Sequence, residues 1–260
     1  MSRQGFYAWQ GRGQSERSKE DEGLGRRIRS LFEESEGTYG APRIHASLQS
    51  EGTRVSRRRV QRLMRAAGLR GRVVRVYRSS PGLRGFFAQH PNRLWKLKPS
   101  RLDQVWVGDV TYLPVGQQWR YLAVVMDQYS RRVLGWSLSE GRGASLTRRA
   151  LDIAVARRQP RRRLIFHSDR GIEYAADKFR DRLRALGVRQ SMTRGGAPCD
   201  NAHMESFFHS LKADVVHGVR FRSERELRSC IARYVRYYNH KRSHSALGYR
   251  SPVEYESRIA

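Results

Sequence analysis

Three acidic residues are the part of this sequence best suited to chemistry. Asp109 interrupts an apolar run at 106–112, where a carboxylate is costly unless it is paired or bound to a metal ion. Asp169 follows a short apolar stretch at 163–167, and the end of a buried strand is a usual place for a functional residue. If Glu205, in a later helical segment, joins them, the three carboxylates repel one another unless a divalent cation with oxygen ligands lies between them. Each acid taken singly is explained equally well as a structural residue.

Periodicity predicts the elements that must position these acids. Alternating apolar and polar residues predict strands, and apolar residues three or four apart predict helices. Ser223 and Glu226 form a capping box that starts a last long helix. The expected strands are 104–113, 119–127, 132–139, 163–167 and 189–192, and the earlier expected helices are 144–157, 175–186 and 201–212. Three antiparallel strands followed by strands that alternate with helices predict a mixed α/β sheet.

The first part of the chain carries the pattern of a small helix-turn-helix domain. One helix is predicted from the apolar spacing that begins at Leu24, a second from Pro42 and a third after Ser56. A short helix, a glycine-containing turn and a second helix make a helix-turn-helix pattern. The third helix presents basic side chains where a recognition helix would face a DNA groove: Arg57, Arg58, Arg62 and Arg65. The alternative is an arginine-rich face turned to solvent.

Charge separates this chain from most globular proteins. It has 260 residues, with 52 Lys+Arg against 24 Asp+Glu and a formal net charge of +28. Residues 52–102 hold fifteen basic side chains and no acidic one. Such a charge repels itself unless a polyanion is near, so nucleic acid is the expected partner, and a solvated basic face is the plainer alternative. The apolar runs are too short for a transmembrane helix, and two cysteines cannot build a disulfide framework, which favours a reduced, cytosolic protein.

In order and spacing, Asp109, Asp169 and Glu205 resemble the DDE signature of retroviral-integrase-like transposases, with thirty-five residues between the last two. The chain is most similar to the insertion-sequence-three family of bacterial transposases, in particular to its second-reading-frame product. The resemblance implies a ribonuclease-H-like integrase catalytic core preceded by a small all-α helix-turn-helix domain. It runs nearly end to end, in SRQGFYAW (2–9), TYGAPRI (38–44), VSRRRVQRLMRAAGLRG (55–71), QVWVGDVTYL (104–113), DQYSRRVLGW (127–136), HSDRGIEY (167–174), DNAHMESFF (200–208) and YYNHKRSHSALGYRSPVEY (237–255).

The resemblance also implies metal-dependent cutting and joining of DNA. We expect two Mg²⁺ ions, with Mn²⁺ as a substitute, where Asp109 bridges both ions and Asp169 and Glu205 complete one site each. Water would free a 3′-hydroxyl at the element end, and that hydroxyl would attack a second phosphodiester. We expect Lys212 to hold a DNA phosphate or end base, the alternative being an exposed helix lysine. Asn201, one turn before Glu205, is expected to orient that carboxylate by hydrogen bonding and to lie among the residues that contact DNA.

The expected organisation follows from these segments. It comprises a flexible lead-in (1–23), a helix-turn-helix DNA-binding domain (24–71), a basic linker (72–101), a ribonuclease-H-like integrase core (102–222) and a C-terminal helix and tail packed on the core (223–260). The expected partners are DNA, both as element ends and as target, further copies of the chain on that DNA, and the transposase product of the upstream frame. No membrane partner is expected, and the expected location is the bacterial cytoplasm, at the nucleoid.

Some residues depart from the family pattern or have another interpretation. Glu173 stands where the family commonly has Gln and adds a carboxylate near the expected site, and Ser243 replaces a usual Pro. Asp127 is interpreted as structural, paired with Arg131 or Arg132. Four tryptophans are interpreted as core or interface residues, with base stacking left open for the first: Trp95, Trp106, Trp119 and Trp136.

Two other functions share part of this evidence. A DNA-binding regulator without catalysis explains the charge and the helix-turn-helix pattern but not an intact acidic triad. A structure-specific nuclease of the same fold shares the triad and the metal but cleaves without joining. An assay on a DNA end separates these functions, because only a transposase yields a joined product.

Overall fold

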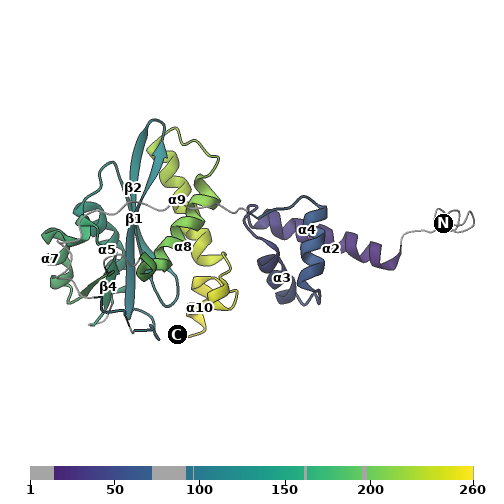
Figure 1. Cartoon of the computed structure of the whole chain (residues 1–260), viewed down its shortest axis with the longest axis horizontal. Helices are drawn as coiled ribbons and strands as arrows, with labels where there is room; N and C mark the ends of the chain where they lie inside the picture. Colours follow the sequence, from purple (N-terminus) through teal and green to yellow (C-terminus); the bar gives the residue numbers. More distant parts are fainter. Residues whose placement is uncertain (1–14, 72–91, 96, 161–162, 195–197, 260) are drawn as a thin grey trace, which may run out of the picture. The chain divides into compact units, whose positions relative to one another are not determined.

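The computed structural model describes residues 15–71, 92–95, 97–160, 163–194 and 198–259. It divides the chain into two units, Met1–Val73 and Val74–Ala260, both drawn in Figure 1. The predicted lead-in before residue 15 and the segment 72–91 of the predicted linker lie outside the described residues.

Three helices build the first unit around one small core: α2 (Glu16–Glu34), α3 (Ala41–Ser50) and α4 (Arg57–Ala66). Pro42 lies in the first turn of α3, and the Ser56 hydroxyl caps α4 by accepting a hydrogen bond from the Arg59 N–H, as the sequence predicts. The three apolar faces pack against one another through Ile28, Leu31, Ile44, Leu48, Val60 and Met64.

Helix α2 begins at Glu16, well before the start predicted at Leu24, so residues 16–23 are helical and not a flexible lead-in. Its early residues are charged and carry no apolar periodicity, which is why the pattern missed them. The Asp21 carboxylate lies 2.7 Å from Arg59 Nε and 2.6 Å from Arg62 Nη2 of α4. Ion pairs between the helices therefore hold a segment that has no apolar face of its own.

The second unit is built on a five-stranded mixed sheet: β1 (Val105–Val115), β2 (Gln118–Asp127), β3 (Val133–Ser139), β4 (Ile165–Ser168) and β5 (Arg189–Met192). The strand order is β3-β2-β1-β4-β5. The first three strands form the predicted antiparallel meander, and β4 and β5 run parallel to β1. The expected mixed α/β architecture is confirmed, and β1 occupies the centre of the sheet.

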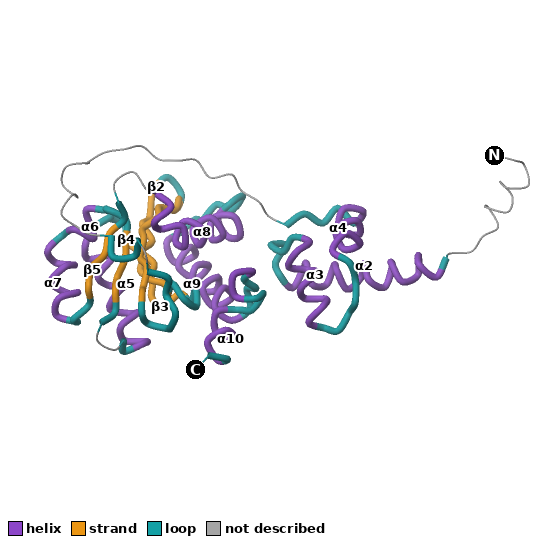
Figure 2. The backbone as a smooth tube through the Cα atoms, turned by 60° about the horizontal axis from the view of Figure 1, so that its bottom comes forward, coloured by secondary structure: helices purple, strands orange, loops and turns teal. Residues whose placement is uncertain are grey.

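Helices cover both faces of this sheet (Figure 2). Alternate residues of each strand point to opposite faces, which divides the apolar side chains into two clusters. One cluster joins the sheet to α5 (Ala144–Arg158) and α7 (Asp177–Ala185), and the other joins it to α8 (Ala202–Leu211) and α9 (Glu224–His240). A short last helix, α10 (Pro252–Ser257), returns to the meander, where the Ser130 hydroxyl donates to Glu256 at 2.7 Å.

Two helical segments differ from their predicted form. The helix predicted at 175–186 is α7, which starts two residues later because Ala176 is extended, with φ −63° and ψ 139°, and a short helix that was not predicted, α6 (Ile172–Ala175), precedes it. The segment predicted as one helix at 201–212 comprises the end of a 3₁₀ turn (Pro198–Asn201), α8 and the start of a π-helical turn (Lys212–Val216). Within the described ranges, every helix is too short or too polar to cross a membrane.

Candidate active site

The strand register brings Asp109 and Asp169 together. Gly108 of β1 pairs with Ser168 of β4 in parallel register, and each acid is the next residue along its chain. The pairing requires a residue without a side chain at 108, since a Cβ there would lie 2.5 Å from the ring of Phe166. The central strand and its parallel neighbour therefore deliver two carboxylates to one point at the end of β4.

Both carboxylates are only partly exposed, and each is destabilised in its charged form. Burial, and then the charge of Asp169, raises the pKa of Asp109 well above its usual range, although the Val110 N–H donates to its Oδ1 at 2.7 Å. Burial also raises the pKa of Asp169, whose Oδ1 accepts a hydrogen bond from the Gly171 N–H at 3.0 Å. The positive charge near the two aspartates is therefore too small to favour the ionised form of both.

A third carboxylate lies beside this pair. The Glu173 side chain, in α6, is 1% exposed and forms an ion pair with Arg142, with Nη2 2.8 Å from Oε1. Its negative charge raises the pKa of both aspartates further. Its Oε2 is buried and has no hydrogen-bond partner among the described residues. The family departure noted at this position therefore places an extra charge next to the site, and Arg142 is the counterion that the sequence pattern did not reveal.

Asn201 joins the start of α8 to the same strand. Its side chain is buried, and Nδ2 donates to the Gly108 carbonyl oxygen at 3.4 Å. Its Oδ1 has no hydrogen-bond partner in the described part of the chain. The predicted hydrogen bond to Glu205 is therefore absent among the described residues, because the amide is committed to the backbone beside Asp109.

The remaining two predicted site residues, Glu205 and Lys212, lie in different environments. Glu205 is exposed on α8, and the described residues hold no cluster of three or more His, Cys, Asp or Glu side chains able to bind a metal. Lys212 is half-buried at the far end of that helix, with Nζ 4.8 Å from the centre of the Tyr112 ring. Burial lowers the pKa of Lys212, and the charge of Asp109 opposes that change, so the ammonium lies within electrostatic reach of the carboxylate.

Comparison with known proteins finds family matches over most of this chain. Residues 99–198 and 186–252 match the integrase core domain, and residues 19–77 match an HTH-like domain. The transposase for insertion sequence element IS904 of Lactococcus lactis subsp. lactis (strain IL1403) is 36% identical over 244 residues, 93% of this chain and 96% of that protein. The transposase InsF for insertion sequence IS3A of Escherichia coli (strain K12) is 35% identical over 275 residues, 99% of this chain and 91% of that protein. The chain belongs to the IS3 family of transposases.

Comparison with solved structures also finds integrases. The HTLV-2 integrase catalytic core domain in complex with magnesium is 16% identical, with a TM-score of 0.44 over 58% of this chain and 95% of that one. A simian T-cell lymphotropic virus intasome in complex with a PP2A regulatory subunit is 15% identical, with a TM-score of 0.49 over 87% of this chain and 73% of that one. The family assignment of the transposase comes from its curated relatives and does not depend on these two.

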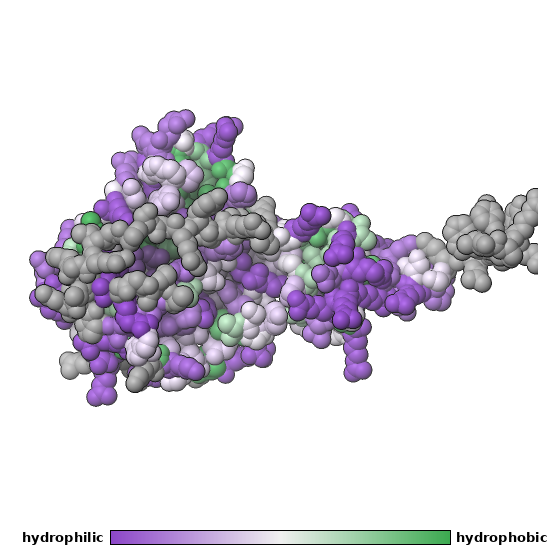
Figure 3. Space-filling view, in the orientation of Figure 1, coloured by the Kyte–Doolittle hydropathy of each residue, from purple (hydrophilic) through white to green (hydrophobic). Residues whose placement is uncertain are grey.

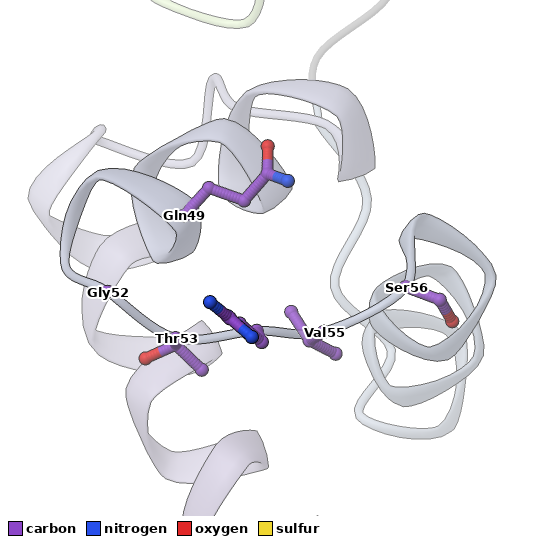
Figure 4. A pocket seen from close by; sticks show the side chains of 6 residues that line it. Gln49, Gly52, Thr53, Val55 and Ser56 are labelled. Carbon is purple, nitrogen blue, oxygen red and sulfur yellow. The ribbon is translucent and has the colours of Figure 1, made fainter.

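The HTH-like unit of the transposase carries the predicted arginines on its surface. Arg58 and Arg65 are exposed and form no ion pair within residues 15–71, and the same holds for Arg57. Arg62 is exposed as predicted but pairs with Asp21, which also pairs with the neighbouring Arg59. The turn that precedes these arginines forms an open pocket between α3 and α4 (Figure 4), lined by Gln49, Gly52, Thr53, Arg54, Val55 and Ser56.

Contacts decide the interpretation of Asp127 in the transposase. Asp127 is structural, but its carboxylate forms an ion pair with neither Arg131 nor Arg132, because its oxygens accept the backbone N–H groups of Asp103, Tyr129 and Ser130. Arg132 instead contacts Glu256, and Arg131 contacts His203.

The tryptophans divide between core and surface. Trp106 is fully buried and Trp136 packs against the core, as predicted. Trp119 is 53% exposed, so it is not a core residue. Trp95, which is 58% exposed, lies under the Arg194 guanidinium at 3.3 Å. The interpretation of Trp119 as an interface residue stays a prediction, and the core alternative is wrong because alternation along a strand cannot distinguish a covered face from an exposed one.

Proposed function

We propose that this transposase, a polynucleotidyl-transferase-type enzyme, cuts and joins DNA at element ends by DDE-type chemistry, with Asp109, Asp169 and Glu205 as its catalytic acids. The observation that carries the proposal is the pairing of Gly108 with Ser168, which sets two acids side by side at the end of β4. Their raised pKa values show that this place disfavours two negative charges in the absence of a cation.

A divalent cation fits this pair. Two recessed carboxylates that repel each other are the hard oxygen donors that Mg²⁺ prefers, and the buried Oε2 of Glu173 adds unsatisfied negative charge nearby. Asp109 and Asp169 would hold the metal, and we extend the proposal to two Mg²⁺ ions, with Mn²⁺ as a substitute. When bound, such ions activate the attacking oxygen and neutralise charge on the phosphodiester.

Helix geometry supports Glu205 as the third acid. Residues four apart share a helix face, and Asn201, four residues before Glu205, is held against Gly108. Lys212, seven residues after it, is within electrostatic reach of Asp109. Two residues on the face of α8 that carries Glu205 are therefore close to β1 or to the charge of Asp109, which supports the proposal that the exposed Glu205 acts as the third acid.

The proposed DNA contacts follow the free positive charge. Lys212 and Asn201 are proposed to lie along the DNA end beside the acids. In the first unit, Arg57, Arg58, Arg62 and Arg65 are proposed to contact the duplex, with the ion-paired Arg62 contributing least. The proposed assembly is a homo-oligomer on DNA, together with the product of the upstream frame, at the bacterial nucleoid.

Strand transfer with a labelled element end tests the proposal. Glu205→Gln keeps the shape of the side chain and removes its charge, so we expect a folded protein that binds DNA and forms no joined product in Mg²⁺. Glu254→Gln, which removes an exposed glutamate of α10 away from the acids, is the matched control and should retain activity. Near-normal joining by Glu205→Gln would overturn the assignment, and cleavage without joining by the unmodified protein would favour the nuclease alternative.

A further inference from the structure

The β1–β2 hairpin continues past the end of β4. In the described residues, β4 pairs with β1 only over Val105–Gly108, whereas β2 pairs with β1 as far as Val115. From Asp109 onward, β1 is therefore paired to a strand on one side only. Figure 1 shows the hairpin rising to the top of this unit, and in Figure 3 the surface there mixes hydrophilic purple with pale and green areas. We call the hairpin beyond Asp109 the β1–β2 arm; one of its faces packs on the core through Leu113 and Val115, and the other face, which carries Tyr112, is exposed.

Two aromatic side chains share one face of this arm. Tyr112 pairs with Tyr121 across the ladder and Pro114 pairs with Trp119, so Tyr112 and Trp119 are diagonal neighbours. Their ring centres are 5.1 Å apart and their planes cross at 88°. Tyr112 is 57% exposed and Trp119 is 53% exposed, although large aromatic side chains normally bury most of their surface. An exposed aromatic pair of this kind offers a ring face to a flat ligand.

The charge and position of the pair indicate which ligand. Lys212 Nζ lies 4.8 Å from the centre of the Tyr112 ring, so a cation accompanies the aromatic surface. Tyr112 is three residues from Asp109, or about 10 Å along a strand, and this odd spacing places the two side chains on opposite faces of β1. In the described residues the edge of β1 that pairs with β4 is unpaired beyond Gly108, and Lys212 lies near both side chains, with Nζ beside the Tyr112 ring and within electrostatic reach of Asp109. About three stacked nucleotides cover this distance over the unpaired edge. A DNA base two or three nucleotides from the phosphate at Asp109 would therefore reach these rings.

We propose that Tyr112 and Trp119 form a stacking platform for an unpaired base near the end of the DNA strand that reaches Asp109. The proposal rests on the proposed function, since it takes the scissile phosphate to lie at Asp109. Stacking on an aromatic ring accepts any base, because every base has a π-face. The platform would therefore favour a frayed DNA end over a paired one without reading its sequence.

Binding to two DNA probes tests the platform without any catalysis. The full chain is titrated, in buffer free of divalent metal, with a short duplex of arbitrary sequence and with the same duplex carrying a few unpaired nucleotides at one end. We expect tighter binding to the unpaired end, and Trp119→Ala should weaken that binding about tenfold while leaving binding to the paired duplex unchanged. Trp119→Phe should recover most of the loss, and Tyr249→Ala, which removes another exposed aromatic side chain, should lose nothing. The proposal would be overturned if the unmodified protein bound both probes equally, or if Trp119→Ala bound the unpaired end as tightly as the unmodified protein does.

A second measurement identifies the contact itself. 5-Iododeoxyuridine at the unpaired positions should crosslink on irradiation to the peptide that contains Tyr112 or Trp119, and crosslinks found only elsewhere would overturn the proposal. Light scattering without DNA tests the other possible occupant, a second copy of the chain. If Trp119→Ala converts an oligomer to a monomer, the aromatic pair is a protein interface and the proposal is wrong. Because neither experiment requires Glu205 or metal, a failure here is distinguishable from a failure of the proposed catalytic function.

Discussion

The Asn201 side chain donates a hydrogen bond to the carbonyl oxygen of Gly108, the residue that precedes Asp109 on the central strand. This contact links two segments far apart in sequence, the start of the helix that carries Glu205 and the strand that carries the first acid. The Asn201 side chain is buried, so water does not compete readily for this hydrogen bond. It ties the position of the helix face to the position of the catalytic strand.

Asn201→Ala should therefore reduce activity more than stability. The loss of one hydrogen bond is expected to lower the free energy of unfolding by about 1 kcal/mol. In a unit of this size that corresponds to a fall in melting temperature of about 2–4 °C. Strand transfer should fall at least about tenfold, since a misplacement near 1 Å can cost that much. Full joining activity at a temperature where the variant is folded would contradict the role assigned to this contact.

Metal binding should stabilise the second unit. A ligand that binds only the folded state at a hundredfold excess over its Kd adds about 3 kcal/mol to the free energy of unfolding. We expect Mg²⁺ to raise the melting temperature of the unmodified protein but not that of Asp109→Asn, which lacks one of the two proposed ligands. In metal-free buffer, Asp109→Asn should melt above the unmodified protein, because it removes the repulsion with Asp169. An equal Mg²⁺ response in both proteins would place the cation elsewhere.

Replacing Arg142 should cost much more folding stability than replacing Glu173, its ion-pair partner. The Glu173 side chain is 1% exposed and the Arg142 side chain is 46% exposed. Arg142→Ala leaves a buried carboxylate without its counterion, which we expect to lower the free energy of unfolding by about 3 kcal/mol or more. Glu173→Gln leaves an arginine that can turn to water, and the loss should be about 1 kcal/mol. Denaturant unfolding of both variants and of the double variant checks this, and the double variant should be more stable than Arg142→Ala.

Salt dependence should separate the free arginines of α4 from the paired ones. Each phosphate contact that is lost should reduce the slope of log K against log salt by about 0.9. We expect that reduction for Arg58→Ala and for Arg65→Ala, measured by fluorescence anisotropy on duplex DNA at several salt concentrations. Arg59→Ala is the matched control, since Asp21 and Glu20 already pair with that guanidinium. A slope that falls equally in all three variants would show that the ion pairs dissolve when DNA binds.

Asp127 should prove necessary for the turn that follows β2. Its two carboxylate oxygens accept three backbone N–H groups, from Asp103, Tyr129 and Ser130. Asp127→Asn can satisfy at most two of them and turns an amide donor toward the Asp103 N–H, which lies 2.8 Å from Oδ2 in the native turn. We expect the free energy of unfolding to fall by about 1–3 kcal/mol. Thermal unfolding without DNA measures this, and an unchanged melting temperature would exclude the turn as the reason for this acid.

The elements of the fold were largely predictable because they follow local rules. Apolar alternation located the strands of the meander, and β5 was placed at its observed residues, Arg189–Met192. Capping chemistry located the helix starts after Ser56 and Ser223, whose hydroxyls accept the expected N–H groups. The start of α2 was not predicted, because ion pairs to α4 hold its first turns and no apolar face marks them in the sequence.

The site was predictable only in part. Apolar surroundings and the resemblance to a family marked Asp109, Asp169 and Glu205, but no local pattern predicts which side chains meet. The partner of Glu173 was invisible because Arg142 lies 31 residues away in sequence. The predicted partner of Asn201 was Glu205, on the same helix face, but the observed partner is the Gly108 carbonyl oxygen. Helix spacing alone cannot show that a strand carbonyl lies within reach of the amide.

The sequence by itself indicated the family and the order of the elements, and it singled out the three acids as candidates, because these depend on residue type and on spacing along the chain. Tertiary structure decided which side chains from different elements lie next to one another. Parallel pairing of β1 with β4 sets Asp109 next to Asp169, and the end of β4 leaves the β1–β2 arm with Tyr112 and Trp119 uncovered. Strand register and the length of a neighbouring strand are properties of the packed sheet, since each balances contacts that come from distant parts of the chain.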